Sequence, residues 1–452
     1  MNKKTIFKNQ KINTLYFGGI YGASVSGLAL FCKRQGFEVR GSDISENEEK
    51  ARKMKESKIR VDTSQNAYNV IGADAYIYTH ALSADNPELA SARAAGIPVL
   101  SRSELLGRIL MGFDNRIGVC GTHGKSTVSA MITEIFSASG KSAESFIGAE
   151  SFKINDAHYE TDTAVFEACE YKRAFLDMNP TVAAVINIEK EHTDTYPKMS
   201  DALEAYVRFA SVAEKAVLCA DNKNCLKIAP YMKKAYFYSL REKKADMYGE
   251  NIRESKGFYS FDAVLRGEKL FSVSLKVPGE HNVSNALCAA LIGYVQGIKS
   301  EDIKRGLESY NGIKRRFEYI GKCRESPVFD DYAHHPSEIR CTLKAARAMG
   351  YKRIVCAFQP HTYSRTKAHF EDFAAVLSEF DEAVIADIYA ARERNVYGVT
   401  SEMLAESVKN GRYIKSFDEI EKYLESISEA DTLILTMGAG RMNEIAARIT
   451  EG

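Results

Sequence analysis

Short apolar runs alternate with longer segments of helical periodicity along most of the chain. Apolar runs at residues 15–17, 117–120 and 354–358 are each followed by a helical pattern. Alternation of this kind is typical of parallel α/β sheets. Similar runs occur at residues 75–78, 164–166, 182–186, 216–218, 383–386 and 432–435, and residues 38–40 are strand-like. We therefore predict an α/β fold with mostly parallel sheets.

The same pattern falls into three blocks along the chain. A chain of 452 residues is too long for one hydrophobic core. We predict three domains, at residues 1–110, 111–313 and 314–452. The first and third are expected to be Rossmann-like. The second is expected to be a P-loop-type ATPase domain with a mostly parallel sheet, because its opening strand leads into a glycine-rich turn and a helix.

Composition and charge narrow the class of protein. The net charge is +1, so no field favours nucleic acid or an anionic membrane surface. Nine dispersed cysteines without a Cys-x-x-Cys pair predict reduced, buried thiols. No signal-like apolar run follows the basic first residues, and no stretch reaches the ~20 apolar residues of a membrane span. We expect a cytoplasmic protein, either a monomer or a homodimer.

The strongest local motif lies between the strand at 117–120 and the next helix. Its members are Gly121, Thr122, His123, Gly124, Lys125, Ser126 and Thr127. Backbone amides in such a turn bind phosphate oxygens, and the helix N-terminus adds the positive end of its dipole. We expect Lys125 to reach the terminal phosphates and the Ser126 hydroxyl to bind magnesium. The loop is one glycine short of the usual motif, since Val119 stands at the first glycine position, so a glycine-rich turn with a solvated lysine is the alternative.

Candidate magnesium ligands follow two strands of the same block. Glu170 comes after the strand at 164–166, and His192 comes after the strand at 182–186. In open α/β folds, ligands bind at the carboxyl edge of the parallel sheet. Phosphoryl transfer needs a magnesium ion (Mg2+) held by hard ligands. We predict that Ser126, Glu170 and His192 hold this ion, although either of the last two alone would suit a surface position.

The first block opens with a glycine-rich turn after its first strand. Gly19, Gly22 and Ser24 lie in this turn, and Asp43 follows one strand later. The turn does not keep the Gly-x-Gly-x-x-Gly register, so the signal is weak. It still predicts a diphosphate at a helix N-terminus, with Asp43 accepting a hydrogen bond from a ribose or uracil group.

Two polar clusters follow strands of the third block. Tyr332 and His334 belong to the first cluster, and His361 and Arg365 belong to the second. Histidine, tyrosine and arginine at adjacent strand ends suit a small carboxylate, because the guanidinium group can pair with it through two hydrogen bonds. A pair of surface histidines is the alternative.

In order along the chain, these motifs resemble those of the Mur ligase family. The resemblance rests on the shortened phosphate loop, Glu170, His192, the string at 279–285, the Lys-Arg-Arg at 314–316 and the two third-block clusters. It covers nearly the whole chain. It implies three domains that bind, in order, a UDP-linked substrate, ATP and an amino acid.

The resemblance also implies roles for individual residues. Lys125, Glu170 and His192 match catalytic positions, and Gly19, Gly22, Ser24 and Asp43 would surround UDP. The adenosine contacts would be His281, Asn282, Asn285, Arg316 and Asp331. The amino-acid contacts would be Tyr332, His334, His361 and Arg365. The chain departs from the family pattern at Ser126, Glu191 and Arg441, but none of these changes removes a required chemical group.

The implied reaction forms an amide bond between UDP-N-acetylmuramate and L-alanine during peptidoglycan precursor synthesis. ATP would first convert the muramyl carboxylate into an acyl phosphate, which the alanine amine then attacks. Three alternatives remain from the sequence. They are a murein-peptide-recycling ligase, a folylpolyglutamate synthetase-like enzyme and a non-enzymatic nucleotide-binding regulator.

Overall fold

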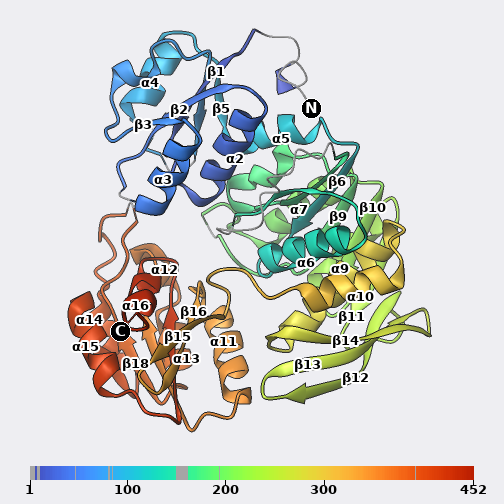
Figure 1. The fold of residues 1–452 in the computed structure, drawn as a ribbon, viewed down its shortest axis with the longest axis vertical. Helices are drawn as coiled ribbons and strands as arrows, with labels where there is room; N and C mark the ends of the chain where they lie inside the picture. Colours follow the sequence, from blue (N-terminus) through green and yellow to red (C-terminus); the bar gives the residue numbers. More distant parts are fainter. Residues whose placement is uncertain are drawn as a thin grey trace. The chain divides into compact units, whose positions relative to one another are not determined.

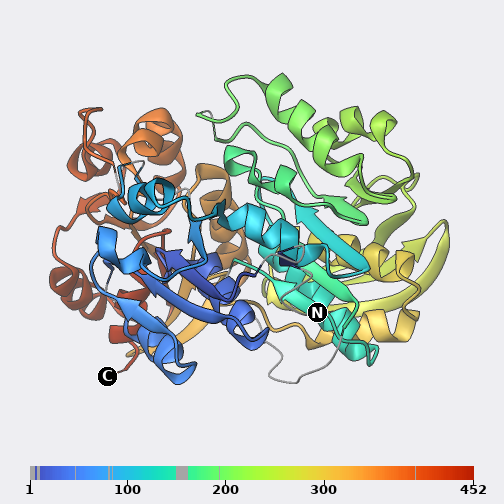
Figure 2. The same ribbon diagram turned by 90° about the horizontal axis from the view of Figure 1, so that it is seen from above.

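The computed structural model describes residues 6–7, 11–45, 47–79, 82–83, 85–148, 161–192, 194–391 and 393–451. The chain divides into two compact units. The first unit comprises residues 1–248, 263–271 and 285–307, and the second comprises residues 249–262, 272–284 and 308–452. Figures 1 and 2 show three sheets, coloured in chain order from blue, through green and yellow, to orange and red. Three mostly parallel sheets confirm the predicted fold class.

The first sheet has the strand order β3-β2-β1-β4-β5, and each printed pair is parallel. Its strands are β1 (Thr14–Gly18), β2 (Glu38–Ser42), β3 (Arg60–Asp62), β4 (Ala75–Tyr78) and β5 (Val99–Ser101). Its helices are α2 (Ala23–Arg34), α3 (Glu48–Glu56), η1 (Ala67–Val70), α4 (Pro87–Ala94) and α5 (Arg102–Leu110). The helix starts follow from local chemistry: the Asn86 side chain caps α4, whose first residue is Pro87. Strand reversal around β1 creates the switch point where a Rossmann-like sheet binds ligands.

The second sheet has the order β14-β13-β12-β11-β10-β9-β6-β8-β7. Its strands are β6 (Asn115–Cys120), β7 (Glu144–Phe146), β8 (Thr163–Glu167), β9 (Val182–Val185), β10 (Lys215–Cys219), β11 (Ala235–Ser239), β12 (Met247–Ser255), β13 (Phe258–Leu265) and β14 (Glu268–Pro278). The helical elements are α6 (Lys125–Ala138), η2 (Tyr171–Asp177), α7 (Met199–Ala210), α8 (Lys223–Ile228), η3 (Ala229–Tyr231), α9 (His281–Val295) and α10 (Ser300–Ser309). Strands β6, β8 and β9 are parallel neighbours, so the loops after them meet at one edge of the sheet. The three strands β12–β14 were not predicted.

The third sheet has the order β15-β16-β20-β17-β18-β19, and only β15 is antiparallel among the printed pairs. Its strands are β15 (Glu318–Cys323), β16 (Ser326–Asp331), β17 (Arg353–Phe358), β18 (Glu382–Ile385), β19 (Gly411–Tyr413) and β20 (Thr432–Met437). Its helices are α11 (Pro336–Ala348), α12 (Tyr363–Ala368), α13 (Phe370–Leu377), α14 (Ser401–Ser407), α15 (Phe417–Ser426) and α16 (Met442–Arg448). Apolar residues are buried on both faces of this sheet, as expected for a helix-covered parallel sheet.

Each predicted domain range contains one of the three sheets, although the limits near residues 110 and 314 remain predictions. All nine cysteines are free thiols, as the sequence predicts. Seven of them are buried, Cys169 is partly buried and Cys341 is exposed. Among the helices that the structure describes, none has the length and apolar character needed to cross a membrane.

Candidate active site

The predicted phosphate loop connects β6 to α6 through a turn with left-handed backbone. Gly124 has a φ of +86° and directly precedes the first residue of α6. A side chain would be strained here, and a Cβ atom at Gly124 would lie 3.0 Å from the side-chain oxygen of Asn285. The left-handed turn at Gly124 therefore leads directly into the N-terminus of α6, where the helix dipole favours an anion.

Asn187 fastens this loop to the segment that follows β9. Its side-chain oxygen accepts a hydrogen bond from the His123 amide at 2.9 Å, and its side-chain nitrogen donates to the His123 carbonyl at 3.0 Å. The Thr122 hydroxyl in turn accepts a hydrogen bond from the Glu189 amide at 2.9 Å. Asn187 was not among the predicted site residues. Its position in the string before His192 was visible, but a pairing with the backbone of a distant loop was not.

Lys125 turns toward the loop carbonyls and the end of β8. Its ammonium group donates to Gly121 O at 2.6 Å and to Thr122 O at 3.1 Å. It also lies 3.1 Å from Oε2 of Glu170, which is buried. Burial is the largest single effect and lowers the pKa of Lys125, but Glu170, Cys169 and Glu167 together outweigh it, so the pKa is raised. The lysine is therefore charged and held at the mouth of the loop.

His192 completes the group around Glu170. Its Nε2 lies 3.7 Å from Oε1 of Glu170, and its ring lies 4.7 Å from that of Tyr171. The backbone of His192 is left-handed, with a φ of +50°. Such backbone is uncommon outside glycine and is concentrated at functional sites. The structure thus brings Lys125, Glu170 and His192 together, and Ser126 and Thr127 lie in the first turn of α6.

The predicted adenosine contacts at 281–285 lie on the first turns of α9. Asn282 is buried and donates from its side chain to the Pro278 carbonyl at 2.7 Å. The exposed His281 ring packs over Gly279, where a Cβ atom would lie 2.5 Å from the ring. Asn285 faces Gly124 of the phosphate loop, as described above. Asn282 therefore has a structural role in the turn, while its nucleotide contact remains a prediction.

In the second unit, the end of β16 carries the predicted residue Asp331. This buried carboxylate accepts hydrogen bonds from the Phe317 amide at 3.0 Å, the Ala333 amide at 2.8 Å and the Thr342 hydroxyl at 3.2 Å. Burial raises its pKa to about 6, although the guanidinium group of Arg316 acts to lower it. Asp331 therefore holds the backbone just before β15 and just after β16. Its contact with a nucleotide remains a prediction.

Two histidines of the second unit face each other at the ends of β16 and β17. The rings of His334 and His361 are 5.9 Å apart. Nδ1–H of His334 donates to the Tyr332 carbonyl, over 2.9 Å. Burial lowers the pKa of His334 to about 4 and that of His361 to about 3. Both rings are therefore neutral at pH 7.

Arg365 lies in α12, directly beside this pair. Its Nη1 donates to Nδ1 of His361 at 3.1 Å, which leaves the proton of that ring on Nε2. Because both imidazoles are neutral, Arg365 is the positively charged member of the four predicted amino-acid contacts. Tyr332 packs against His334 with ring centroids 5.3 Å apart, so all four lie in one group. A cation beside two neutral polar rings suits a small carboxylate.

The predicted UDP loop joins β1 to α2, and Asp43 holds it in place. Oδ2 of Asp43 accepts a hydrogen bond from the Tyr21 amide at 2.8 Å, and Oδ1 accepts from the Ser45 amide and hydroxyl at 2.9 and 2.6 Å. Gly19 has a φ of +72°, and Gly22 precedes the first residue of α2. Asp43 thus holds the loop in place through the Tyr21 amide. Its contact with a ribose or uracil group remains a prediction.

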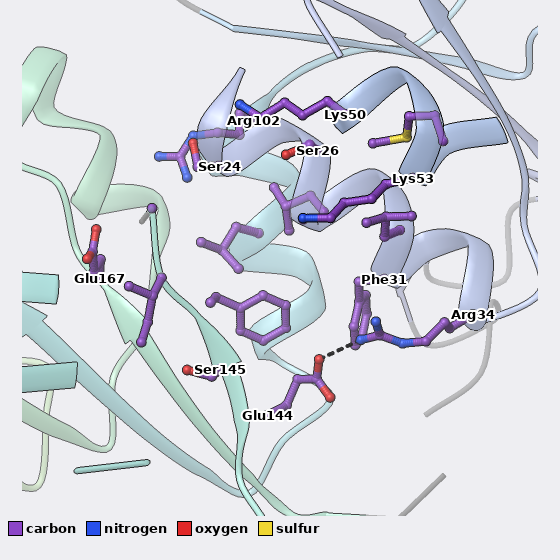
Figure 3. A pocket seen from close by; sticks show the side chains of 18 of the residues that line it. Ser24, Ser26, Phe31, Arg34, Lys50, Lys53, Arg102, Glu144, Ser145 and Glu167 are labelled. Atoms are coloured by element: carbon purple, nitrogen blue, oxygen red, sulfur yellow. Dashed lines mark hydrogen bonds and ion pairs between the residues drawn. The ribbon is translucent and has the colours of Figure 1, made fainter. Parts of the chain in front are cut away.

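A cavity of about 270 Å³ in the first unit lies next to this loop (Figure 3). Ser24 and Ser26 of α2, together with Lys50 and Lys53 of α3, line one part of it. The other lining residues include Arg102, Glu144, Ser145, Glu167 and Cys169. Lys53 and Arg102 point their cationic groups toward the space in Figure 3. Sequence analysis missed these cations, because their convergence depends on packing between separate parts of the chain.

The matches to known proteins agree with this arrangement. The Mur ligase middle domain matches residues 119–293, the glutamate ligase domain of Mur ligases matches residues 315–440, and the Mur ligase family catalytic domain matches residues 14–114. The chain therefore belongs to the Mur ligase family.

Within that family, similarity extends over almost the full chain. A UDP-N-acetylmuramate–L-alanine ligase of Agathobacter rectalis is 41% identical, with 95% of this chain and 96% of the relative covered. A protein of the same name from Acetivibrio thermocellus is 39% identical, with 98% and 97% covered. The crystal structure of a UDP-N-acetylmuramate–alanine ligase from Thermotoga maritima has a TM-score of 0.83 at 26% identity and covers 97% of this chain and 98% of that one.

Proposed function

We propose that this protein is an ATP-dependent ligase that joins L-alanine to UDP-N-acetylmuramate in peptidoglycan precursor synthesis. The full-length similarity to proteins of that name supports the proposal most directly. The group formed by Lys125, Glu170 and His192 at a phosphate loop supports ATP as the energy source. Each of the three domains then binds one substrate: the UDP-linked substrate binds to residues 1–110, ATP to 111–313 and the amino acid to 314–452.

The phosphate loop binds the ATP phosphates through its amides and the N-terminus of α6. Lys125 leaves its carbonyl partners and follows the terminal phosphate, where its charge offsets the negative charge that develops during transfer. Asn187 keeps the His123 backbone in place on both its amide and carbonyl sides. The loop is thus organised before the nucleotide arrives, which reduces the ordering that binding requires.

The donor groups near this loop fit a divalent cation such as Mg2+. Glu170 supplies carboxylate oxygens, His192 supplies Nε2 within 3.7 Å of them, and Ser126 adds a hydroxyl at the start of α6. Carboxylate and hydroxyl oxygens are the hard ligands that magnesium prefers. When bound, the ion would neutralise phosphate charge and polarise the transferred group.

The cavity beside α2 is proposed to receive UDP-N-acetylmuramate. One part of its lining starts at the predicted UDP loop with Ser24, and another contains Glu167 and Cys169, close in sequence to Glu170. A substrate with its diphosphate at the loop therefore directs its far end toward the phosphate site. Lys53, which is paired with Glu49 at 2.7 Å, and Arg102 supply positive charge at the cavity, as an anionic substrate requires.

The reaction follows from the need to activate a carboxylate. Transfer of the terminal phosphate from ATP to the muramyl carboxylate gives an acyl phosphate and ADP. The neutral amine of alanine attacks the carbonyl carbon, and inorganic phosphate leaves from the tetrahedral intermediate. Arg365 binds the alanine carboxylate, with His361, His334 and Tyr332 around it. This contact fixes the amino acid by its acid end and leaves the amine to react.

A substrate-panel assay tests the proposal. Phosphate release from ATP should require both UDP-N-acetylmuramate and L-alanine, and the product should gain the mass of one alanine residue. Release with a peptide in place of alanine would instead indicate a murein-peptide-recycling ligase. Release with a folate substrate and glutamate, or the absence of any coupled release, would contradict the proposal.

A further inference from the structure

A buried carboxylate lies in the first domain beneath the predicted UDP loop. Glu88 is fully buried, and four side chains donate hydrogen bonds to it. Oε1 accepts from Nδ2 of Asn69 at 2.8 Å, and it lies 3.2 Å from the Tyr16 hydroxyl, which shares its one proton with Oδ2 of Asp62 at 3.1 Å. Oε2 accepts from the Ser42 hydroxyl at 2.7 Å and from the Tyr76 hydroxyl at 3.3 Å. Oε2 therefore has two donors, and Oε1 has one donor and a share of the Tyr16 proton.

The carboxylate of Glu88 lies at the start of a helix and among neutral polar side chains. Glu88 is the second residue of α4, so it lies at the positive end of the helix dipole. All four donors are neutral, and burying an ionised group among neutral partners is costly unless its hydrogen bonds are well formed. The charge of Glu88 also raises the pKa of Tyr16 and of Tyr76, after the larger effect of burial on each hydroxyl. Both hydroxyls therefore remain protonated and able to donate.

Two of the four donors lead directly to the loop between β1 and α2. The Ser42 carbonyl accepts hydrogen bonds from the Gly19 amide at 2.8 Å and from the Ile20 amide at 3.0 Å, so Ser42 binds the loop on one side and Glu88 on the other. The Tyr76 hydroxyl lies under Gly18, where a Cβ atom would come within 2.2 Å of it. Glu88 thus holds Ser42, which binds the loop backbone, and Tyr76, whose hydroxyl packs against Gly18 at the start of the loop.

We propose that Glu88 is a positioning residue for the binding of the UDP part of the substrate. It acts through Ser42 and Tyr76, which set the path of the backbone at residues 18–20. The inference rests on the proposed function for the assignment of this loop to UDP. It adds a residue that lies on the helix α4, outside the glycine-rich motif, and that does not itself contact the ligand.

The substitution Glu88→Gln separates charge from shape. The amide keeps the size of the side chain but presents an N–H2 group to two of the four donors. A hydroxyl can turn and accept from it, whereas the Asn69 amide nitrogen cannot, so the network has to rearrange. If the network positions the loop, UDP binding should weaken roughly tenfold, as expected for the loss of one charge-assisted hydrogen bond.

A matched control is available at the other end of the same strand. The carboxylate of Asp74 accepts hydrogen bonds from the Asn13 amide at 2.8 Å and the Thr14 amide at 2.9 Å, where β1 begins. Asp74→Asn therefore replaces the carboxylate acceptor of these two amides by a weaker, neutral amide oxygen at the end of the strand away from the loop. It should lower the urea midpoint of unfolding while leaving UDP binding unchanged.

The test measures UDP binding by calorimetry and the KM values of all three substrates for the full-length protein and both variants. We expect Glu88→Gln to weaken UDP binding and to raise the KM of UDP-N-acetylmuramate, with the KM of ATP and of alanine and kcat nearly unchanged. Wild-type affinity for UDP in this variant, or an equal loss in Asp74→Asn, would overturn the proposal. If Glu88→Gln does not fold, Tyr76→Phe removes one donor and should give a smaller shift in the same direction; an unchanged affinity there would also overturn it.

Failure of the proposed function would be distinguishable. If wild-type protein binds UDP but does not join alanine to UDP-N-acetylmuramate, the ligase assignment fails while the role of Glu88 is still decided by UDP binding. If wild-type protein does not bind UDP, the positioning role of Glu88 is wrong.

Discussion

Arg365 shows how a single residue can gain a function from its neighbours. Burial keeps His334 and His361 neutral at pH 7, and the Arg365 guanidinium donates to Nδ1 of His361. Its direction is therefore set by a ring that does not compete for a carboxylate. The sequence predicted this pairing of residue types, but the protonation states came only from the packed structure.

Replacement of Arg365 by lysine should affect one substrate selectively. Lysine keeps the charge but loses the planar fork that binds a carboxylate through two hydrogen bonds. The KM of alanine should rise by about tenfold, while the KM of ATP and of UDP-N-acetylmuramate stays near the wild-type value. Steady-state kinetics with each substrate varied in turn measures this. An unchanged KM for alanine, or an equal rise for all three substrates, would show that Arg365 is structural.

Glu170 and His192 should act together on the metal requirement. They lie 3.7 Å apart at their nearest ligand atoms, so Glu170→Gln and His192→Ala should each raise the magnesium concentration needed for half-maximal rate. The double variant should show less than the sum of the two effects, since both residues would serve one ion. Titration of the rate with magnesium tests this, and an unaltered requirement in both single variants would contradict the assignment.

The phosphate loop is an element whose motif was readable but whose support was not. The glycines and Lys125 predicted its position between β6 and α6. Asn187 was not predicted because its side chain bonds to the backbone of His123. Every residue has the same backbone groups, so the sequence of the loop does not reveal such a partner. Glu88 was missed for a similar reason, since its four donors come from different elements of the first domain.

Asn187→Ala should loosen the phosphate loop. The substitution leaves the His123 amide and carbonyl without their side-chain partner, and an unpaired buried group costs about 1–3 kcal/mol. The KM of ATP should rise, and kcat should fall because the loop no longer holds the phosphates in one position. Asn187→Asp is the matched variant: it keeps the acceptor for the His123 amide and should retain more activity than alanine. Equal kinetics for both variants and wild type would contradict this role.

The strands β12–β14 differ in their sequence pattern from the strands that were predicted. In β14, Phe271, Val273 and Leu275 are buried, whereas the residues between them are exposed. This period of two was present in the sequence and predicts a strand with one solvated face. The prediction relied on continuous apolar runs, which are typical of strands buried on both faces. The runs that were found, such as those of β6, β9 and β17, became strands within a few residues of their expected limits.

For the whole molecule, the partly buried histidines His334 and His361 predict an effect of pH on stability. The pKa of His334 is lowered from 6.5 to about 4 and that of His361 from 6.5 to about 3. Between those values and 6.5, the unfolded chain binds protons that the folded chain does not, so stability falls as the pH falls. Glu338 acts to raise the pKa of His334, and Arg365 acts to lower both. Asp331 has the opposite sign, because its pKa is raised from 3.8 to about 6 and its contribution is lost as the pH rises through that value.

The pKa of His281 is also lowered, to about 4, and those of Asp330 and Glu144 are raised like that of Asp331. We expect the three histidines to outweigh these carboxyl groups, so the urea midpoint should decrease from pH 7 to pH 4.5. His361→Gln removes one of the three titrating rings and should flatten this dependence. Urea unfolding at a series of pH values, followed by circular dichroism, measures both curves. A wild-type midpoint that rises as the pH falls, or a variant with the same slope, would contradict the assignment.

The distribution of the thiols has a practical consequence for measurements on this protein. Cys341 is exposed on α11, while burial raises the pKa of the other eight cysteines, so they are poor nucleophiles in the folded chain. A maleimide dye should therefore attach first at Cys341 and place one fluorophore on the domain proposed to bind the amino acid. The further dye molecules that attach as urea is added would count the chains that have opened.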